Sequence, residues 1–307
     1  MKISVLTSLY NCQRFLLGYF QHLSKIDNLH EVEVILLHNA PREEELAIIE
    51  NQKPSLPPGL VKHIHINQRE SLYASWNRGV ELARGTYIAI WNVDDIRESD
   101  SLSVQARTLD DNPYAGMTYG DIIGVDKYGD LKGRFYFHPE YDKMKEDFVR
   151  SCYCSCFPMW RKSVHDSVGL FDEQLRVSGD FDFQIRLARQ MPLVKAHKFL
   201  GYYLDSDPGK LTTANNRITV ETTAVELRYG IFDKINLLFL RKALTFIDIQ
   251  NLYWKEKKEF VSDWFPEHKY WLRRNSMLFP KSIWGLPRDI ASALKNRLLL
   301  DKTGNCY

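Results

Sequence analysis

Long apolar runs and a disulfide framework are both missing from this sequence. A helix that crosses a membrane needs about 20 consecutive apolar residues, and no stretch of the chain approaches that length. The opening segment, MKISVLTSLYNC, becomes polar too early for a secretory signal and has no small-residue cleavage site. The five cysteines are odd in number, which argues against paired extracellular disulfides. We therefore expect a cytoplasmic protein without a transmembrane helix.

Strong net charge and several ligand-binding motifs are absent as well. The formal net charge is only +2, so no broad electrostatic field favours nucleic acid as a partner. The sequence has neither a Gly-x-Gly-x-x-Gly after its first predicted strand nor a Gly-x-x-x-x-Gly-Lys loop, which disfavours a dinucleotide-binding dehydrogenase and a P-loop enzyme. Its nine histidines form no His-x-x-x-His pair, so a zinc hydrolase has no support.

A regular alternation of strand and helix patterns is present from the first residues on. Segments rich in β-branched residues alternate with segments whose apolar residues recur at helical spacing. This rhythm predicts an α/β fold with a doubly wound, mostly parallel sheet and helices on both of its faces. The expected strands are residues 2–9, 31–37, 61–66 and 86–90, and the expected helices are residues 11–24, 42–51 and 73–84.

The pattern loosens in the middle of the chain and becomes mainly helical toward its end. We predict a main α/β domain over residues 1–213 and a helical C-terminal extension over residues 214–307. In the middle of the chain we expect strands at 116–125 and 133–137 and helices at 101–109, 162–168 and 181–189. In the extension we expect helices near 217–229, 231–245, 250–261 and 285–299.

An acidic pair follows the fourth predicted strand. Asp94 and Asp95 lie in the segment Asn92-Val93-Asp94-Asp95, at the kind of strand end where α/β sheets bind their ligands. Two carboxylates there form a hard-oxygen site for Mn²⁺ or Mg²⁺, an ion that neutralises charge on a leaving nucleotide. A simple helix cap is the alternative explanation, because aspartate is common at helix starts.

Several motifs around this pair resemble glycosyltransferase family 2, whose members have the GT-A fold. Residues 77–88 match the family pattern Asn-x-Gly-(Ile/Val)-x-x-Ala-x-Gly-x-Tyr-Ile, which precedes the acidic segment in the same order. Residues 168–173 match the later Gly-x-Phe-Asp-Glu, and residues 178–188 match the acidic helix start that follows. The resemblance covers residues 1 to about 213. It implies a GT-A type fold and inverting transfer of a sugar from a nucleoside diphosphate donor.

The resemblance also implies catalytic and metal-binding roles. Asp180 is the expected catalytic base, which deprotonates the acceptor hydroxyl as that oxygen attacks the anomeric carbon; a helix cap is again the alternative. Asp94 and Asp95 are expected to bind Mn²⁺ or Mg²⁺. Asp207, in the loop YLDSDPGKLT, is either a further metal ligand or a turn residue.

Substrate contacts follow from the same resemblance. Trp160 is expected to stack on the acceptor sugar or to pack in the core, and Asp182 is expected beside the acceptor. A UDP- or GDP-linked donor sugar is expected to contact Thr7, Leu9, Asn39, Asn77, Asn92 and Asp94.

The sequence departs from the family pattern at several of these places. His38-Asn39-Ala40-Pro41 stands where the family often has Asp-Asp-Gly-Ser, so the preferred nucleobase is open. Asn92 replaces the first acid of the metal motif, and Gly179 replaces an acid before Asp180. Trp76 stands where the family often has arginine.

Two other clusters allow more than one interpretation. Cys152, Cys154 and Cys156 are expected to pack as apolar residues, because structural zinc sites prefer Cys-x-x-Cys pairs and four ligands. The tail over residues 268–302 is basic and aromatic. Such a segment lies on an anionic membrane surface, caps the main domain or forms a homodimer interface.

The combined hypothesis is an inverting, metal-dependent glycosyltransferase. Its acceptor is expected to be a carbohydrate or a lipid-linked molecule in the assembly of surface polysaccharide or glycolipid. A nucleotidyltransferase is the rival enzyme, although Thr7-Ser8-Leu9-Tyr10-Asn11 is not the glycine-rich basic loop that it needs. A catalytically degenerate binding or scaffold protein is the non-enzymatic alternative.

Overall fold

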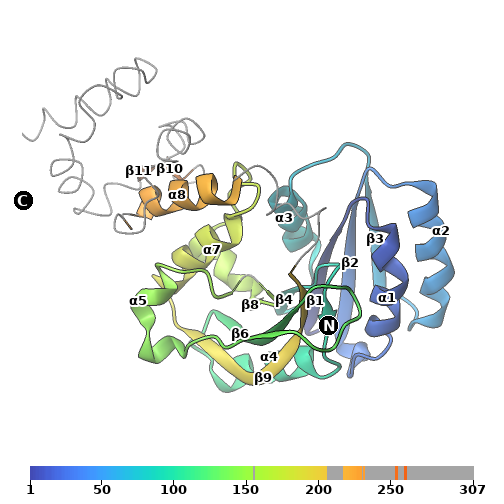
Figure 1. Ribbon diagram of the computed structural model, residues 1–307, viewed down its shortest axis with the longest axis horizontal. Helices are drawn as coiled ribbons and strands as arrows, with labels where there is room; N and C mark the ends of the chain where they lie inside the picture. Colours follow the sequence, from blue (N-terminus) through green and yellow to red (C-terminus); the bar gives the residue numbers. More distant parts are fainter. Residues whose placement is uncertain (155, 206–216, 230, 232–252, 255–258, 261–307) are drawn as a thin grey trace, which may run out of the picture. The chain divides into compact units, whose positions relative to one another are not determined.

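A curled sheet organises the first of the two units into which the chain divides, Met1–Ala214 and Asn215–Tyr307. The structure is a computed structural model and describes residues 1–154, 156–205, 217–229, 231, 253–254 and 259–260. Within them the sheet has nine strands in the order β3-β2-β1-β4-β8-β6-β9-β5, with β7 paired to β6 (Figure 1). The strands are β1 (Ile3–Leu9), β2 (Val32–Asn39), β3 (Val61–Ile66), β4 (Tyr87–Ile90), β5 (Ile96–Arg97), β6 (Met117–Val125), β7 (Arg134–Tyr136), β8 (Met159–Arg161) and β9 (Leu193–Leu204).

The strands β1 to β4 form a parallel half, and β8 joins that half to the rest of the sheet. β1 pairs in parallel with β2 and β4, and β2 pairs in parallel with β3. β8 runs antiparallel to both β4 and β6, whereas β6 and β9 are parallel again. The predicted α/β class and mostly parallel sheet are therefore confirmed. The apolar runs of β1 and β2 are buried almost throughout, as parallel strands covered on both faces require.

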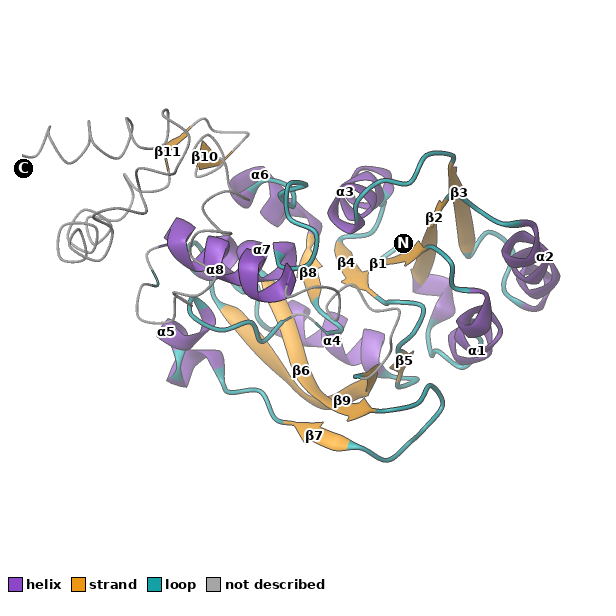
Figure 2. Cartoon of the chain, turned by 45° about the horizontal axis from the view of Figure 1, so that its top comes forward, coloured by secondary structure: helices purple, strands orange, loops and turns teal. Residues whose placement is uncertain are grey.

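Helices cover both faces of this sheet (Figure 2). Leu16 and Leu109, on the first and fourth helices, share one core with Val5 of β1. The helix α3 (Leu72–Leu82) packs on the opposite face, where a Cβ added at Gly79 would lie 2.9 Å from side-chain atoms of Leu6 and Leu37. The helices are α1 (Gln13–Leu23), α2 (Glu43–Gln52), α3 (Leu72–Leu82), α4 (Ser101–Asp111), α5 (Lys145–Phe148), α6 (His165–Val168) and α7 (Gly179–Ala188).

A second core of aromatic rings lies between α3, α7 and the sheet. Phe171 and Phe183 pack with ring centroids 4.4 Å apart, and Trp160 contacts both of them. Tyr73 and Trp76 of α3 also contact Phe171. The start of α7 is therefore fixed against the start of α3, which follows the carboxyl end of β3.

Three strands of this unit were not predicted. β5 has only two residues and β8 only three, too few to show a periodic pattern. β9 has twelve residues, but its pairing with β6 shifts register twice, at Gly120/Asp121 and at Asp121/Ile123. Such irregularities interrupt the alternation of buried and exposed side chains on which strand prediction depends.

The second unit contains one helix and a short strand pair among its described residues. α8 (Arg217–Tyr229) lies where a helix was predicted. The helix predicted over 250–261 is wrong at two places, because β10 (Tyr253–Trp254) pairs antiparallel with β11 (Glu259–Phe260). Aromatic residues such as Tyr253, Trp254 and Phe260 favour strands. Residues 232–245 and 285–299 lie outside the described part, and the domain boundary at 213 and the helical character of the extension stay predictions.

Candidate functional site

The carboxyl ends of β1, β2 and β4 meet at one edge of the sheet. The chain passes from β1 to β2 on one side of β1, and it returns to place β4 on the other side. Such a reversal of strand order opens a crevice in which doubly wound sheets bind ligands. The acidic turn after β4 lies directly at this reversal.

The turn from Asn92 to Asp95 is closed by its own side chains. Asp95 Oδ2 accepts a hydrogen bond from Asn92 Nδ2 at 3.1 Å, and Asp95 Oδ1 accepts one from the backbone N–H of Leu204 at 3.2 Å. Asp95 is 2% exposed. Its carboxylate therefore ties the turn to the end of β9, and Asn92 supports it. Asp94 is only half-buried, so it is the acid of this pair that lies nearer the surface.

A buried cation lies beneath the turn. The Arg97 guanidinium is 2% exposed and donates to Gln105 Oε1 at 2.8 Å and to the Ile90 carbonyl at 2.9 Å. Burial lowers the pKa of Arg97 to about 9, and the charge of Asp95 opposes that shift. Even so, Arg97 stays charged at neutral pH. Its positive charge stabilises the acidic turn.

Two tyrosines that sequence reasoning missed also lie near the turn. Burial, and then the charges of Asp95 and Asp94, raise the pKa of Tyr128. Burial also raises the pKa of Tyr203 on β9, and the charges of the same two acids add to that shift. The Tyr128 hydroxyl is buried and has no hydrogen-bond partner among the described groups. Tyr128 lies in the turn after β6, and Tyr203 lies at the end of β9. The tertiary fold brings both to the acidic turn, so nothing in the local sequence distinguishes them.

Asp180 lies at the start of α7, on the same carboxyl edge as α3's first turn. It is half-buried. Its Oδ1 accepts hydrogen bonds from the Tyr73 hydroxyl at 3.2 Å and from the backbone N–H of Phe181 at 2.9 Å. Asp180 is the second residue of α7, and the helix N-terminus there favours the ionised carboxylate.

The end of β1 presents a different residue from those predicted. Thr7 and Leu9 are 0% exposed, and Thr7 Oγ1 forms a 2.7 Å hydrogen bond with the Tyr19 hydroxyl. Their side chains are therefore core groups. Tyr10, the next residue, is 42% exposed, and the Arg69 guanidinium lies 3.9 Å from its ring centroid. The accessible group at this strand end is thus an aromatic ring with a cation on it.

Asn39 and Asn77 connect the family motifs to each other. Asn39 Nδ2 donates to Ser75 Oγ at 2.9 Å, and its Oδ1 accepts from the backbone of Glu70. Asn77 bonds both the N–H and the carbonyl of Phe171 at 2.9 Å. Both side chains are buried. They hold α3 against β2 and against the Gly-x-Phe-Asp-Glu loop, so their amides are already engaged within the protein.

Gly85, in the motif that begins at Asn77, has a steric role. A Cβ added at Gly85 would lie 2.6 Å from the backbone nitrogen of Ser4 and 2.8 Å from the carbonyl carbon of Ile3. The N–H of Gly85 donates to Ser4 Oγ at 2.8 Å. The close approach of this turn to β1 therefore requires glycine, and it sets the register of β4 that positions the acidic turn.

A family model for "Glycosyl transferase family 2" matches residues 4–168 of the chain, more than half of its length. The chain belongs to glycosyl transferase family 2. The motifs that carry the family resemblance are the ones that the structure brings together, since Asn77 binds the loop at Phe171 and Tyr73 binds Asp180.

Curated relatives of this family 2 chain are distant. The PGL/p-HBAD biosynthesis glycosyltransferase of Mycobacterium tuberculosis is 28% identical over 166 residues, which cover 53% of this chain and 61% of that protein. This chain thus spans about three fifths of the length of that relative. The uncharacterised glycosyltransferase YwdF of Bacillus subtilis is 24% identical over 220 residues, which cover 70% of this chain and 78% of the relative.

Solved structures share the GT-A fold with this family 2 chain. TarS 1–349 of S. aureus, solved in complex with UDP-GlcNAc, superposes with a TM-score of 0.61 at 17% identity, covering 97% of this chain and 88% of that one. The mannosyltransferase PcManGT of Pyrobaculum calidifontis, solved with GDP-Man and Mn²⁺, gives a TM-score of 0.57 at 12% identity and covers 97% and 85%. The predicted GT-A type fold is confirmed.

Two expected acceptor contacts of this family 2 protein are internal instead. Trp160 is 0% exposed, and its Nε1 donates to His165 Nε2 at 2.9 Å. Its ring has no face open to a sugar, so core packing is the correct reading. Asp182 is 1% exposed and forms a 2.9 Å ion pair with Arg186 one turn along α7. Its carboxylate is turned into the protein by this pair, which contradicts an acceptor contact.

Three further predictions concern Asp207, the cysteine cluster and the absence of a transmembrane helix. Asp207 lies outside the described residues. Cys154 is buried, which agrees with apolar packing, whereas Cys152 is exposed. None of the described helices combines the length and the apolar character that crossing a lipid bilayer requires.

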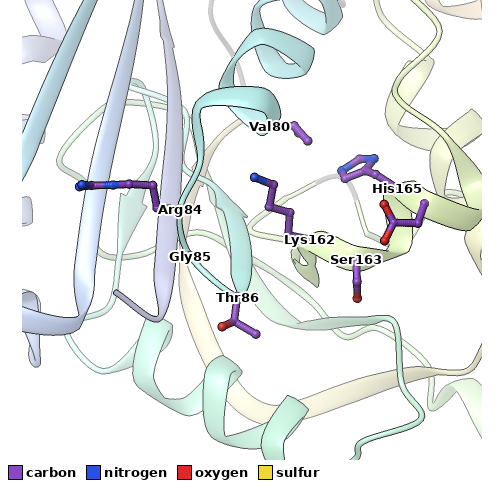
Figure 3. A pocket seen from close by; sticks show the side chains of 8 residues that line it. Val80, Arg84, Gly85, Thr86, Lys162, Ser163 and His165 are labelled. Atoms are coloured by element: carbon purple, nitrogen blue, oxygen red, sulfur yellow. The ribbon is translucent and has the colours of Figure 1, made fainter.

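A surface pocket lies at the opposite, amino edge of the sheet (Figure 3). It is bordered by the turn 84–86 before β4 and by Lys162 and His165. Arg84 points away from Lys162, and its Nε donates to Glu33 Oε2 at 2.9 Å. Lys162 Nζ donates to the carbonyl of Ala83. These polar groups serve the fold, and none of the predicted site residues lines this pocket.

Proposed function

We propose that this protein transfers a sugar, with inversion, from a nucleoside diphosphate donor to a hydroxyl acceptor. The observation that carries the proposal is the placement of Asp94 and Asp180. Both are half-buried carboxylates at the carboxyl edge of a GT-A sheet, and each lies near a buried acid that maintains the fold. TarS and PcManGT, which share this fold, were solved with nucleotide sugars.

The donor set after β4 fits Mn²⁺ or Mg²⁺. Asp94, Asp95 and Asn92 offer only oxygen ligands, apart from the Asn92 amide nitrogen that is used within the turn. No group of three acidic, histidine or cysteine side chains among the described residues is arranged to hold a metal alone. One or two carboxylates are nevertheless the usual protein share of such a site, since substrate phosphates complete the shell. When bound, the ion would neutralise charge on the leaving nucleoside diphosphate.

The protein's own groups supply the rest of the reaction. Asp180 takes the proton from the acceptor hydroxyl while that oxygen forms a bond to the anomeric carbon. The bond from the anomeric carbon to the diphosphate oxygen breaks on the opposite face, and its electron pair leaves with the nucleotide. The Tyr10 ring, with Arg69 beside it, is suited to stack on a nucleobase.

The name of one relative supports the proposed acceptor class. The mycobacterial protein carries a name that refers to PGL/p-HBAD biosynthesis, and we propose a carbohydrate or lipid-linked acceptor for this chain as well. Cytoplasmic location and contact of the tail with a membrane surface stay part of this proposal.

Donor turnover tests the proposal directly. We expect the protein to release UDP or GDP from at least one nucleotide sugar in the presence of Mn²⁺, and we expect EDTA to abolish this release. Calorimetry of UDP and GDP with and without Mn²⁺ measures the binding step separately. Metal-independent affinity would remove the metal role, and the absence of both turnover and nucleotide binding would favour the scaffold alternative.

A further inference from the structure

Tyr73 is singled out by no motif, yet its hydroxyl reaches the proposed base. It is the second residue of α3 and is 1% exposed. Its hydroxyl donates to Asp180 Oδ1 at 3.2 Å. Phe171 stacks on the ring at 5.7 Å with an interplanar angle of 17°, and Trp76 meets it edge-on at 5.3 Å. The Tyr73 ring is therefore fixed by its neighbours, with its hydroxyl directed at Asp180.

Gly179 makes this arrangement possible. A Cβ added at Gly179 would lie between 2.6 and 2.7 Å from three carbons of the Tyr73 ring. Carbon atoms that are not covalently linked do not approach each other this closely, so a larger residue would displace the ring. At the position where the family pattern has an acid, this chain thus has no side chain, and the Tyr73 ring fills the space.

Two donors converge on one oxygen of Asp180. Besides Tyr73, the backbone N–H of Phe181 donates to the same Oδ1 at 2.9 Å. Hydrogen bonds to the ionised form fix the rotamer of a carboxylate and lower its pKa. The 3.2 Å contact is longer than the roughly 2.5–2.7 Å of a short charged hydrogen bond, and contacts of this kind tighten in the substrate complex.

We propose that Tyr73 is a positioning residue for Asp180, and that Gly179 is its required partner. This inference rests on the proposed role of Asp180 as the catalytic base. Tyr73 does not touch the substrate. It sets the direction of the carboxylate and keeps it ionised, in a chain that lacks the acid found next to the base in the family pattern.

The titratable groups around Asp180 do not change their protonation at acid pH. Asp180 is therefore the group expected to set the acid limb of the pH–activity profile, the range in which activity rises with pH. Burial, and then the charge of Asp180, raises the pKa of the Tyr73 hydroxyl well above its usual value. Desolvation and the same charge raise the pKa of the buried Cys154 thiol, whereas Cys152 is exposed. Phenols and thiols do not ionise in the acid range, so Tyr73 and both cysteines stay protonated there. Asp182 is held in its ion pair with Arg186.

Tyr73→Phe is the deciding variant, because it keeps the ring and removes only the donor. We expect kcat to fall roughly tenfold, the scale of one hydrogen bond to a charged group, with an unchanged KM for the donor. The base works only when ionised, and loss of the donor raises its pKa. The acid limb of kcat/KM should therefore move about one pH unit higher.

Tyr141→Phe is the matched control. The Tyr141 hydroxyl is also largely buried, but it donates to the carbonyl of Ala188 at the other end of α7. Its loss should cost similar stability and leave the acid limb unmoved. Gly179→Ala keeps the phenol but pushes the ring away, so it should shift the acid limb as Tyr73→Phe does. It also decides the case if Tyr73→Phe does not fold.

An unmoved acid limb in Tyr73→Phe overturns the inference, whatever happens to stability. A shift of equal size in Tyr141→Phe overturns it as well, because the effect would then be general to α7. Asp180→Asn, measured in the same assay, distinguishes a failure of the proposed function from a failure of the positioning role of Tyr73. If Asp180→Asn is active, the proposed function fails; if it is inactive while Tyr73→Phe behaves like the parent protein, only the positioning role of Tyr73 fails.

Discussion

The turn after β4 and the start of α7 each carry two carboxylates, and in each region one of the two is buried. At the turn, Asp95 is 2% exposed and closes the local hydrogen bonds, whereas Asp94 is half-buried. At the helix start, Asp182 is 1% exposed and paired with Arg186, whereas Asp180 is half-buried. In both regions the buried acid holds the backbone that presents its neighbour.

The two regions differ in how the buried acid is compensated. Asp95 accepts hydrogen bonds from two neutral groups, the Asn92 amide and the Leu204 backbone, and also interacts electrostatically with the buried Arg97. Asp182 is compensated by a full charge, and Arg186 also bonds the carbonyls of Val168 and Leu170. Removing one member of a buried ion pair strands the other charge. The helix region should therefore be the more sensitive of the two to loss of its buried acid.

Asp182→Asn should give the largest effect on stability. We expect the free energy of unfolding to fall by about 3 kcal/mol, because the Arg186 guanidinium stays buried without its counter-charge. Chemical denaturation measures this loss. Glu50→Gln is the control, since Glu50 pairs with Lys53 on the surface and is 62% exposed, where such pairs contribute little. Equal stability of the two variants would contradict the structural role of Asp182.

Asp94→Asn should act on the ligand rather than on the fold. We expect Mn²⁺-dependent affinity for UDP or GDP to fall on the order of tenfold, the scale of one charged contact, while the melting temperature stays near that of the parent. Titration calorimetry with and without Mn²⁺ provides the measurement. An unchanged metal-dependent affinity would show that Asp94 is only a residue of the turn between β4 and β5.

The sequence predicts the positions of these acids but not the division of roles within each pair. Strand and helix patterns place the elements of the parallel half correctly, and β3 coincides with its predicted range, 61–66. The division depends on contacts far along the chain. Leu204 reaches Asp95 across 109 positions, and Tyr73 reaches Asp180 across 107. No local pattern reports such contacts.

Trp160 shows that the role of an apolar residue, too, depends on contacts that a local sequence pattern does not report. An aromatic residue on a short segment is equally consistent with sugar stacking and with core packing, and only the neighbours decide. Here Phe171 and Phe183 lie against its ring at 5.8 and 5.5 Å. Tyr10 is the converse case, because it lies one residue beyond the largely buried strand β1 and is itself 42% exposed.

Asp95→Asn should give the smallest effect of the series. An asparagine still offers an oxygen to Leu204, so we expect a loss of about 1 kcal/mol, the scale of one neutral hydrogen bond. Nucleotide affinity should fall less than in Asp94→Asn. The same calorimetry and denaturation experiments compare the two variants side by side. A larger loss of metal-dependent affinity in Asp95→Asn would mean that the buried acid, not the half-buried one, is the principal metal ligand.

The central claim is that Asp180 removes the acceptor proton, and single-site kinetics test it most directly. Asp180→Asn keeps the size of the side chain and an acceptor oxygen at Oδ1, and the N-cap of α7 is Ser178 rather than Asp180. We predict an unchanged melting temperature, an unchanged affinity for the donor, and a fall in kcat of about 10²-fold or more, the usual scale for a general base. An Asp180→Asn protein that transfers sugar at the parental kcat would contradict the account.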